Sequence, residues 1–544
     1  MHRCLELNEV LQRIARSLGF DPLLKEPLPK RLLNMALTCR AFRGPALDEL
    51  WRELKDIAVL LRLFSKHRVG RRHGRLVMIS PPTEAEWAIF EAYARRVRII
   101  DVKANSVDWH SVMKFHPNKQ LFPNLSQIGC FCDDMTRYLP ILTQSPVKRL
   151  SFSFRTMQNA SALAGCVSTC AKTLNALTFI PDPNTCDDEV AESLLIADMF
   201  GPLRFLTTVV IGTPHSKTLD CLGALSYLRT LELHVFPIAS HYNTEPLPFP
   251  VLVEVTINFS SSQSLDAIAR LLGRVDGPKL QGIHVLPTQK IPRRNSEQLM
   301  DCSGVNEVIS QVGKFAELSL LEFDTVEEVW DVPEGGRTLL QHLLPLRRMA
   351  QLHLSRIEFR LEVSDLKDIV EAWPNLWSLH LGERVAHNPS RPPPTTQLED
   401  LLILADRCPR LNTIGLLVAV DPERTYDEQR PPFGQSKSGA SALCLGPLEK
   451  GDYYGAAAFL ASVFPRGEVV GQWDLDESDS WSEVSYHGDD RGPGSALDNL
   501  YETIKIITGQ MARVGLHHDN SCEDCEYCSL LSDDEDVLLD DLSD

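Results

Sequence analysis

The chain has 544 residues, of which 43% are hydrophobic and 24% charged, and its formal net charge is −18. This length exceeds what one compact core supports, so we expect several units or an elongated repeat array. From residue 519 onward there are eleven acidic and no basic residues, which leaves −18 + 11 = −7 on the rest and disfavours nucleic-acid binding. Apolar runs such as residues 401–405 are far too short to span a membrane, and the N-terminus shows no signal-peptide pattern. The scattered cysteines predict a reduced protein of the cytoplasm or nucleus.

Three short helices are predicted within residues 5–54, and Asn8 is placed to cap the first of them. Their inward-facing residues recur at helical spacing: Val10, Leu11, Ile14 and Leu18, then Leu32, Leu33, Ala36 and Leu37, then Leu47, Leu50, Trp51 and Leu54. About 50 residues with this much apolar surface are not expected to be stable alone. The segment is therefore predicted to dock on a partner or on the rest of the chain.

Residues 7–11 (LNEVL), 36–42 (ALTCRAF) and 50–52 (LWR) together resemble an F-box, in particular that of the F-box leucine-rich-repeat proteins expanded in mushroom-forming fungi. Asn8 stands where that family usually has proline. The resemblance implies that residues 1–54 bind a Skp-type adaptor, which joins the chain to a cullin scaffold. By position in the motif, the adaptor-binding residues would be Leu7, Glu9, Val10, Leu11, Ile14, Leu37, Cys39 and Trp51. The alternative is a helical cap for the repeats that follow.

Residues 55–96 are predicted to be linking helices. Thr83 and Glu86 have the spacing of a capping box, and Trp87, Phe90 and Tyr93 then trace an apolar face. A basic cluster precedes this helix and is predicted to be a solvated loop, with a nuclear-import signal as the alternative. Its members are Lys66, His67, Arg68, Arg71, Arg72, His73 and Arg75.

A frame of three apolar positions, L-x-x-L-x-L with substitutions, recurs through the middle of the chain. The twelve frames are Val97-Ile100-Val102, Leu125-Ile128-Cys130, Val147-Leu150-Phe152, Leu174-Leu177-Phe179, Leu206-Val209-Ile211, Leu228-Leu231-Leu233, Leu252-Val255-Ile257, Leu280-Ile283-Val285, Phe315-Leu318-Leu320, Met349-Leu352-Leu354, Leu376-Leu379-Leu381 and Leu411-Ile414-Leu416. Their first positions run from 97 to 411, a mean spacing of 314/11, or about 28.5 residues. Internal repetition of this length is typical of stacked repeat architectures.

The frame has a physical interpretation. Its last two positions are two residues apart, so both point inward from one short strand, and stacked strands form a parallel sheet. The intervening residues suffice for a crossover helix, as at residues 364–372. Several frames follow a proline, as in Phe122-Pro123-Asn124-Leu125, which ends the preceding helix. The pattern resembles irregular leucine-rich repeats, and predicts an α/β solenoid of about 12 repeats over residues 97–420.

Beyond the frames, residues 421–515 are predicted to form a polar insertion and a helical C-terminal cap, with an amphipathic helix at 496–514. Residues 516–544 are predicted to be a disordered acidic tail. Cys522, Cys525 and Cys528 follow His517 and His518 in this tail, at a spacing compatible with Zn²⁺. Free thiols in an unstructured tail are the favoured interpretation, so no metal site is assigned.

The sequence contains no phosphate loop, no G-x-S-x-G elbow and no H-E-x-x-H pair, and we expect a non-enzymatic binding protein without a cofactor. The predicted function is that of a substrate receptor in a cullin-type ubiquitin ligase, with a protein target on the concave face of the repeats. A repeat scaffold without a ubiquitin role is the alternative. Target-facing candidates are Lys148, Ser151, Arg229, Glu232, Glu254, Thr256, Gln351, His353, Ser378 and His380.

Overall fold

A computed structural model describes residues 8–21, 26–102, 107–115, 120–130, 139–154, 157–181, 199–212, 216–235, 245–261, 264–288, 303–325, 335–357, 359–382, 394–421, 438–445, 454–465 and 468–469. The chain divides into two compact units, Met1–Ala386 and His387–Asp544, so the division falls inside the predicted solenoid. Within the described ranges, no helix is both long and apolar enough to cross a membrane. The predicted helix at 496–514, the acidic tail and the cysteine cluster of the tail lie outside these ranges.

Three helices open the first unit, as the sequence predicts. They are α1 (Asn8–Leu18), α2 (Pro29–Thr38) and α3 (Arg40–Leu50), with a small antiparallel pair, β1 (Phe20–Asp21) and β2 (Glu26–Pro27), between α1 and α2. The prediction that Leu33 and Leu37 face inward is wrong, because their exposed fractions are 48% and 76%. Helix α2 buries the stripe formed by Leu32, Met35 and Ala36, and Leu33 and Leu37 lie outside it.

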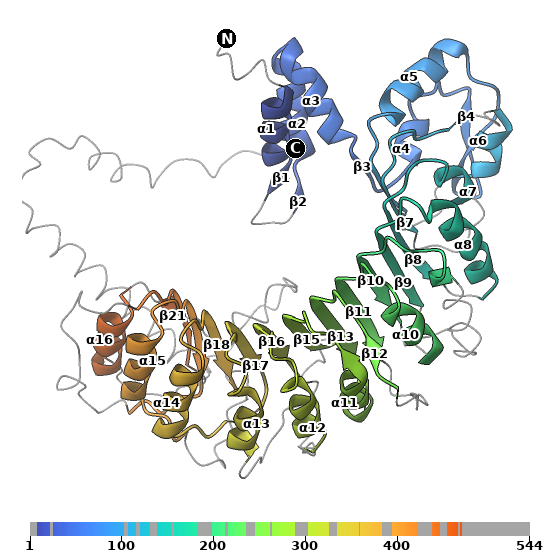
Figure 1. Ribbon diagram of the computed structural model, residues 1–544. Helices are drawn as coiled ribbons and strands as arrows, with labels where there is room; N and C mark the ends of the chain where they lie inside the picture. Colours follow the sequence, from blue (N-terminus) through green and yellow to red (C-terminus); the bar gives the residue numbers. More distant parts are fainter. Residues whose placement is uncertain are drawn as a thin grey trace, which may run out of the picture. The chain divides into compact units, whose positions relative to one another are not determined.

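One parallel sheet runs through the rest of the first unit, with its strands side by side in a single row (Figure 1). The strand order is β18-β17-β16-β15-β13-β11-β10-β9-β8-β7-β6-β3, and each neighbouring pair is parallel. The strands are β3 (Glu53–Leu54), β6 (Ile99–Val102), β7 (Gln127–Cys130), β8 (Arg149–Phe154), β9 (Ala176–Pro181), β10 (Thr208–Ile211), β11 (Thr230–Val235), β13 (Glu254–Phe259), β15 (Gly282–Pro287), β16 (Leu320–Phe323), β17 (Gln351–Leu354) and β18 (Ser378–Leu381).

Helices occupy most of the described connections between successive strands, and α10 to α14 lie along one side of the row (Figure 1). The connecting helices are α4 (Ala58–Leu61), α5 (Glu84–Ala94), α6 (Trp109–Phe115), α7 (Leu139–Leu142), α8 (Met157–Cys170), α10 (Ser216–Gly223), α11 (Leu265–Arg274), α12 (Ser303–Val312), α13 (Gly335–Leu343) and α14 (Val363–Ala372). Helix α5 begins with the predicted capping box, in which Thr83 and Glu86 bond reciprocally. Helix α14 confirms the crossover helix predicted at 364–372. A row of parallel strands that mostly alternate with helices, among the residues that the structure describes, makes the first unit an α/β solenoid.

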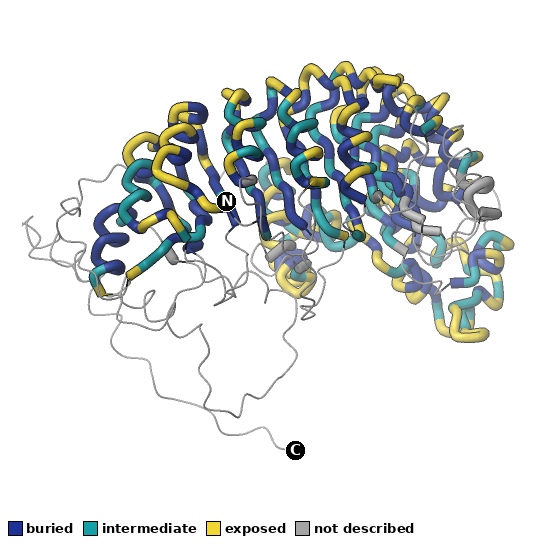
Figure 2. The backbone as a smooth tube through the Cα atoms, turned by 90° about the horizontal axis from the view of Figure 1, so that it is seen from below, coloured by how far each residue is buried: buried dark blue, intermediate teal, exposed yellow. Residues whose placement is uncertain are grey.

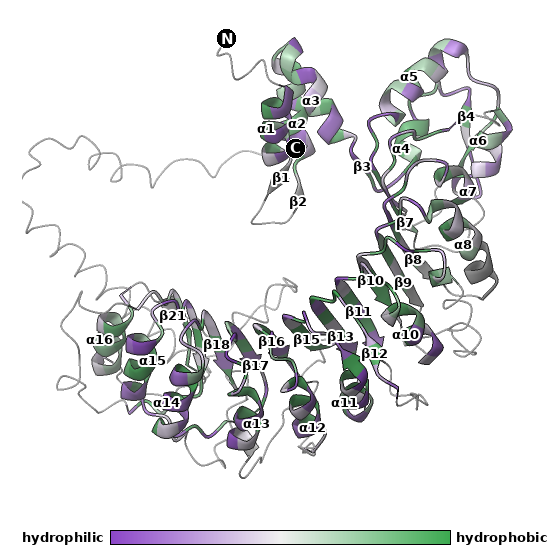
Figure 3. Cartoon of the chain, viewed as in Figure 1, coloured by the Kyte–Doolittle hydropathy of each residue, from purple (hydrophilic) through white to green (hydrophobic). Residues whose placement is uncertain are grey.

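The core lies between the sheet and these helices. Val255, Ile283, Leu321, Leu352 and Leu379 occupy matching positions on five neighbouring strands, and each is at most 1% exposed. Burial alternates along the strands, whereas exposed residues gather on turns and outer helix surfaces (Figure 2). The helices carry hydrophilic as well as hydrophobic stretches (Figure 3). Stacking therefore buries one continuous apolar layer, which no single repeat could do alone.

The prolines ahead of the strands mark a further core position. The residue before the proline is almost fully buried in each case: Phe122, Phe249, Trp373 and Cys408 are at most 2% exposed. Proline disfavours the helical conformation in the residue before it, so the helix ends there and that residue's side chain is buried in the core. The sequence showed the proline but not this use of its neighbour.

Eleven of the twelve predicted frames match the observed register, and one is wrong. The frame Phe315-Leu318-Leu320 should be Leu318-Leu321-Phe323, since Leu321 aligns with Ile283 and Leu352 in the sheet. Leu321 is fully buried, whereas Leu320 is half-buried. The error arose because the apolar run at 318–321 satisfies both frames, and only pairing with neighbouring strands separates them.

Strands also lie beyond both predicted limits of the solenoid. At its start, β3 pairs with β6, so Glu53–Leu54 belongs to the sheet and not to a helical segment. The second unit contains β19 (Thr413–Leu416), β20 (Ala442–Cys444) and β21 (Glu468–Val469), paired in parallel in that order, with the 3₁₀ helix η4 (Leu398–Asp400), α15 (Leu401–Arg407) and α16 (Tyr454–Val463). Ala440, Leu443 and Leu445 are all buried and repeat the three-then-two spacing of the frame.

Two small sheets complete the first unit. The basic cluster forms an antiparallel hairpin of β4 (Val69–Arg72) and β5 (Arg75–Met78) instead of the predicted loop. His73 and Gly74 form its turn with φ angles of 51° and 78°, and this left-handed pair suits a two-residue hairpin. Elsewhere, β12 (Leu247–Pro248) pairs in parallel with β14 (Val275–Asp276).

Candidate binding surfaces

The three N-terminal helices, here called the helical module, have a core of their own. Ala15, Leu32, Met35, Ala36 and Ala46 form a buried cluster. Ile14, Phe42, Leu47 and Leu50 pack against this cluster and are themselves partly buried. One side of α2 therefore packs against the other helices of the module.

The structure distributes the predicted adaptor-binding residues over three environments. Leu11 is 4% exposed, and Ile14 packs on the core of the module, so neither presents a free side chain. Glu9 and Leu37 are exposed, while Val10, Cys39 and Trp51 are intermediate. Leu7 lies outside the described residues.

The opposite side of α2 carries two exposed leucines. Leu33 and Leu37 are four residues apart, so they lie on the same face of the helix, 48% and 76% exposed. We call this pair the leucine face. Leu33 was not among the predicted adaptor-binding residues, although its spacing from Leu37 could have indicated it. A helix that is apolar on both sides, with only one side packed, has surface available to a partner.

Trp51 attaches the helical module to the repeats. Its ring lies 4.8 Å from that of Tyr93 on α5. The Arg52 carbonyl accepts hydrogen bonds from the backbone N–H groups of Arg98 and Ile99, which continue the main sheet. The Arg96 guanidinium also bonds to the Gly44 carbonyl at 3.2 Å, and to the Asp48 carboxylate. These contacts fix where α3 ends relative to the first strands.

A second surface is the face of the main sheet opposite α10–α14, here called the open sheet face. It is formed by the first and third residues of the strands, because the second and fourth residues are buried against the helices. The third residues of β11, β13, β15, β16, β17 and β18 align in register. In order they are Glu232, Thr256, His284, Glu322, His353 and His380, here called the His–Glu ladder.

The target-facing candidates mostly lie on this face. Glu254, Gln351 and Ser378 occupy first positions of their strands, although Ser378 is only 1% exposed. Ser151 occupies the third position of β8, aligned with Thr178. Lys148 and Arg229 are exposed but precede their strands. Glu232, Thr256, His353 and His380 belong to the ladder itself.

His284 lies at the centre of the ladder between two carboxylates. Its Nδ1 is 2.7 Å from Glu322 Oε2, and its Nε2 is 3.3 Å from Glu254 Oε1. The hydrogen bond to Glu322 raises the pKa of the His284 imidazole, and the charges of both carboxylates act in the same direction against burial. His284 is 18% exposed, whereas Glu254 and Glu322 are 46% and 39% exposed, so solvent still reaches the carboxylates.

The ends of the ladder have their own hydrogen bonds. At β11, Glu232 Oε1 lies 3.2 Å from His234 Nε2 and accepts a 2.8 Å bond from the Asn258 amide. The bond from His234 lowers the pKa of Glu232, more than burial raises it. At β17 and β18, the His353 ring meets the His380 ring edge-on at 4.6 Å, and its Nε2 lies 2.7 Å from the Ser378 hydroxyl.

Sequence reasoning missed four members of this network, namely His234, Asn258, His284 and Glu322. His284 occupies the residue between the last two apolar positions of its frame, the same place as Glu232 and His353, so the frame itself could have indicated it. Glu322 was hidden by the wrong frame at 315–320, which put Ser319 in that place. The pairing of β16 with β15 and β17 resolves this.

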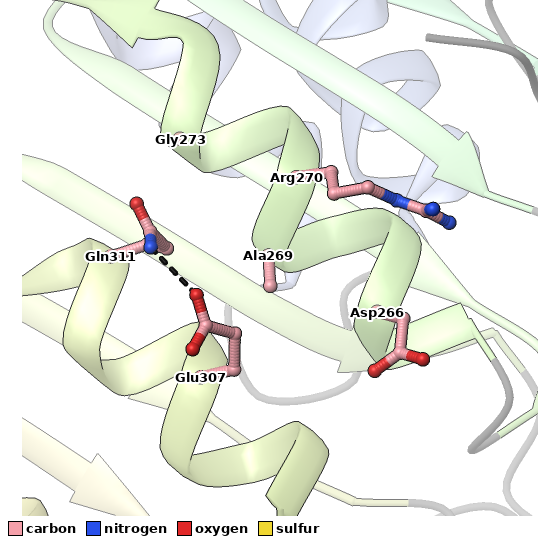
Figure 4. Close-up of a pocket in the computed structure, with 6 residues that line it drawn as sticks. All are labelled: Asp266, Ala269, Arg270, Gly273, Glu307 and Gln311. Carbon is pink, nitrogen blue, oxygen red and sulfur yellow. Dashed lines mark hydrogen bonds between the residues drawn. The ribbon is translucent and has the colours of Figure 1, made fainter. Parts of the chain in front are cut away.

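A shallow polar cavity of about 310 Å³ lies between α11 and α12, on the helix side of the sheet (Figure 4). Its lining residues are Asp266, Ala269, Arg270, Gly273, Glu307 and Gln311. The amide of Gln311 donates a 2.7 Å bond to Glu307 across one turn of α12. Among the described residues, no group of three His, Cys, Asp or Glu side chains is arranged to hold a metal ion. The cavity contains no nucleophile–base pair.

Comparisons with known proteins leave the family open. No family model matches the chain, and no curated protein matches it. Among solved structures it is similar to a complex of Rad7 and Elc1 from yeast, with 14% identity, a TM-score of 0.33, and coverage of 72% of this chain and 92% of the other. An internalin from Listeria monocytogenes matches at 12% identity and a TM-score of 0.27, with coverage of 69% and 88%. Similarity this low does not decide function, and the repeat architecture is established by the sheet and helices described above.

Proposed function

We propose that the chain is the substrate-recognition subunit of a cullin-type ubiquitin ligase. In this proposal the helical module docks a Skp-type adaptor, and the open sheet face binds a protein target. The chain supplies no bond chemistry of its own, because ubiquitin transfer takes place on partner subunits. The leucine face carries this proposal: a small helical module with a packed core still exposes two leucines on one helix face. The expected compartment is the cytoplasm or nucleus.

Burial of the leucine face would contribute a substantial part of the free energy of adaptor binding. Full burial of a leucine side chain contributes roughly 1.5–3 kcal/mol. Scaled by the exposed fractions of 48% and 76%, covering Leu33 and Leu37 contributes about 2–4 kcal/mol, or about thirtyfold or more in Kd. Replacing both with aspartate removes this term and places charge in the contact.

Attachment of the module to the repeats also supports the proposal. Trp51 against Tyr93, and Arg96 against Asp48, hold α3 at the start of the sheet. A ligase receptor benefits from a fixed separation between adaptor and target, because that separation decides which lysines are reached. The contacts at the end of α3 would provide it.

One observation favours the alternative of a repeat scaffold capped by the helical module. Leu11 and Trp51, both expected to face an adaptor, are used inside the chain instead. A cap needs such internal contacts and no adaptor. A cap does not require Leu33 and Leu37 to be exposed, so their exposure favours the adaptor proposal.

The test is co-purification of the full chain with a Skp-type adaptor, comparing wild type with a Leu33→Asp, Leu37→Asp variant. A matched control, Ile89→Asp with Val363→Asp, places the same charges at aliphatic sites on α5 and α14 that are 50% and 41% exposed. We expect the adaptor to bind wild type and the control but not the leucine-face variant. Absence of binding by a folded wild type would leave the scaffold alternative. Substitution of Leu11 is avoided because it would test folding of the module.

A further inference from the structure

The open sheet face between β11 and β18 has an unusual charge composition. Its ionisable strand residues, among those described, are three glutamates and four histidines, with no lysine or arginine. They are Glu232, Glu254, Glu322, His234, His284, His353 and His380. With neutral imidazoles the strip carries three negative charges, and a proton gained by His284 offsets one of them. Because His284 lies between Glu254 and Glu322, its protonation state affects the charge that these two carboxylates present.

We propose that the His–Glu ladder is a docking strip for an extended basic segment of a target protein, which it binds at neutral pH and releases on acidification. This inference rests on the part of the proposed function that assigns target binding to the open sheet face. The occupant is basic because the carboxylates are 34%, 46% and 39% exposed, on a face to which the described strands contribute no lysine or arginine. Each carboxylate also has an imidazole beside it that can compete for the same charge.

The spacing of the carboxylates indicates the spacing of basic residues in the target. Glu232 and Glu322 lie on β11 and β16, three strand steps apart in the sheet. Neighbouring strands are about 4.8 Å apart, which makes about 14 Å across the strip. An extended segment rises about 3.3 Å per residue, so about four residues cover this distance. Residues i and i+4 of an extended segment point to the same side, and two basic residues at that spacing would reach both carboxylates.

Acid release follows from the groups that surround each histidine. His284 faces Glu254 from β13 and Glu322 from β16, His234 faces Glu232 with Asn258 beside it, and His353 faces His380 and Ser378. A protonated His284 pairs with the carboxylates that the target's basic residues would otherwise bind. Hydrogen bonding by Glu322 raises the pKa of His284, so its protonation begins at a higher pH than that of an isolated imidazole.

The test measures binding of labelled peptides to the full chain by fluorescence anisotropy at low salt, at pH 7.5 and pH 5.5. The probe is Thr-Arg-Thr-Ser-Thr-Arg-Thr, compared with Thr-Thr-Arg-Arg-Thr-Ser-Thr and with the glutamate version of the first. We expect the first peptide to bind best at pH 7.5 and to lose about tenfold or more in affinity at pH 5.5. Equal affinity at both pH values, no binding at all, or equal binding of the acidic peptide would each overturn the inference.

Variants assign the effect to the ladder. The triple change Glu232→Gln, Glu254→Gln, Glu322→Gln should weaken binding about tenfold at pH 7.5, since the exposed ion pairs that the two arginines of the probe lose each contribute modestly. The matched control removes three carboxylates from helices on the other side of the sheet, in Asp266→Asn, Glu307→Gln, Glu371→Gln, and should bind as wild type does. If both triple variants lose equal affinity, the attraction is only the net charge of the chain and the inference fails.

A histidine variant tests release, and adaptor capture separates the two proposals. His284→Gln should retain more binding at pH 5.5 than wild type; an unchanged pH profile would overturn the role of His284. Thermal unfolding checks each variant, and the single change Glu254→Gln, at the most exposed of the three sites, replaces the triple change if that unfolds. Peptide failure with intact adaptor binding removes only this inference, whereas pH-dependent peptide binding without adaptor binding removes only the ligase role.

Discussion

The register of β16 can be tested by two single substitutions at neighbouring leucines. Leu321 is fully buried between Ile283 and Leu352, and Leu320 lies on the open sheet face between Gly282 and Gln351. Truncating a buried leucine to alanine costs roughly 2–5 kcal/mol because of lost burial and the cavity that remains. We therefore expect Leu321→Ala to lower the free energy of opening of this region by about 3 kcal/mol, and Leu320→Ala by less than about 1 kcal/mol.

Hydrogen exchange of the amides in β15, β16 and β17 is the suitable assay, because a repeat array need not unfold in one step. The loss of protection in Leu321→Ala should be largest in these three strands and should fade within a few repeats on either side. A larger loss in Leu320→Ala than in Leu321→Ala would refute the register. It would restore the frame Phe315-Leu318-Leu320 and remove Glu322 from the ladder.

Three further outcomes are expected. Hydrogen bonds from Ser65 and from the Thr83 backbone lower the pKa of Glu86 from 4.5 to about 2. The contribution of ionised Glu86 to the stability of α5 is therefore present above the unfolded pKa and should be lost as pH falls from 4.5 towards 2. Glu86→Gln should flatten this pH dependence of hydrogen exchange in α5, and an unchanged profile would contradict the prediction. Gly382 has φ +73°, and a Cβ added there would lie 2.6 Å from the Ile357 carbonyl oxygen. Gly382→Ala should therefore lower Tm clearly more than Gly74→Ala, whose added Cβ meets nothing within 4 Å. Equal shifts in Tm would argue against this close approach of Gly382 to Ile357. Burial raises the pKa of the Cys166, Cys170 and Cys408 thiols to about 11, so at pH 8 they should react with iodoacetamide far more slowly than the half-buried Cys39, as mass spectrometry of the native chain would show.

The architecture was largely predictable because its signal is repeated. One frame is weak evidence, but successive frames at similar spacing define a row of strands, and Leu231, Val255 and Ile283 indeed align. Where the apolar run was longer than the frame, at residues 318–321, the register could not be chosen from one strand alone. The additional strands β3 and β20 were missed because one is two residues long and the other three.

The binding surfaces were less predictable for a different reason. A helix such as α2 carries apolar residues at five positions, and hydrophobicity alone does not say which stripe a neighbour covers. The contacts with α1 and α3 select Leu32, Met35 and Ala36, which leaves Leu33 and Leu37 exposed. Likewise, the His–Glu ladder depends on alignment between strands separated by some 20 to 40 residues of sequence, and a single sequence does not contain that alignment.

The central claim is that the leucine face of the helical module binds a Skp-type adaptor. Calorimetric titration of purified adaptor into the full chain tests it most directly. The proposal predicts saturable one-to-one binding with a negative heat capacity change, since apolar surface is buried, and its loss in the Leu33→Asp, Leu37→Asp variant but not in the Ile89→Asp, Val363→Asp control. A folded wild-type chain that gives no heat of binding when adaptor is added would contradict the claim and identify the module as a cap of the repeats.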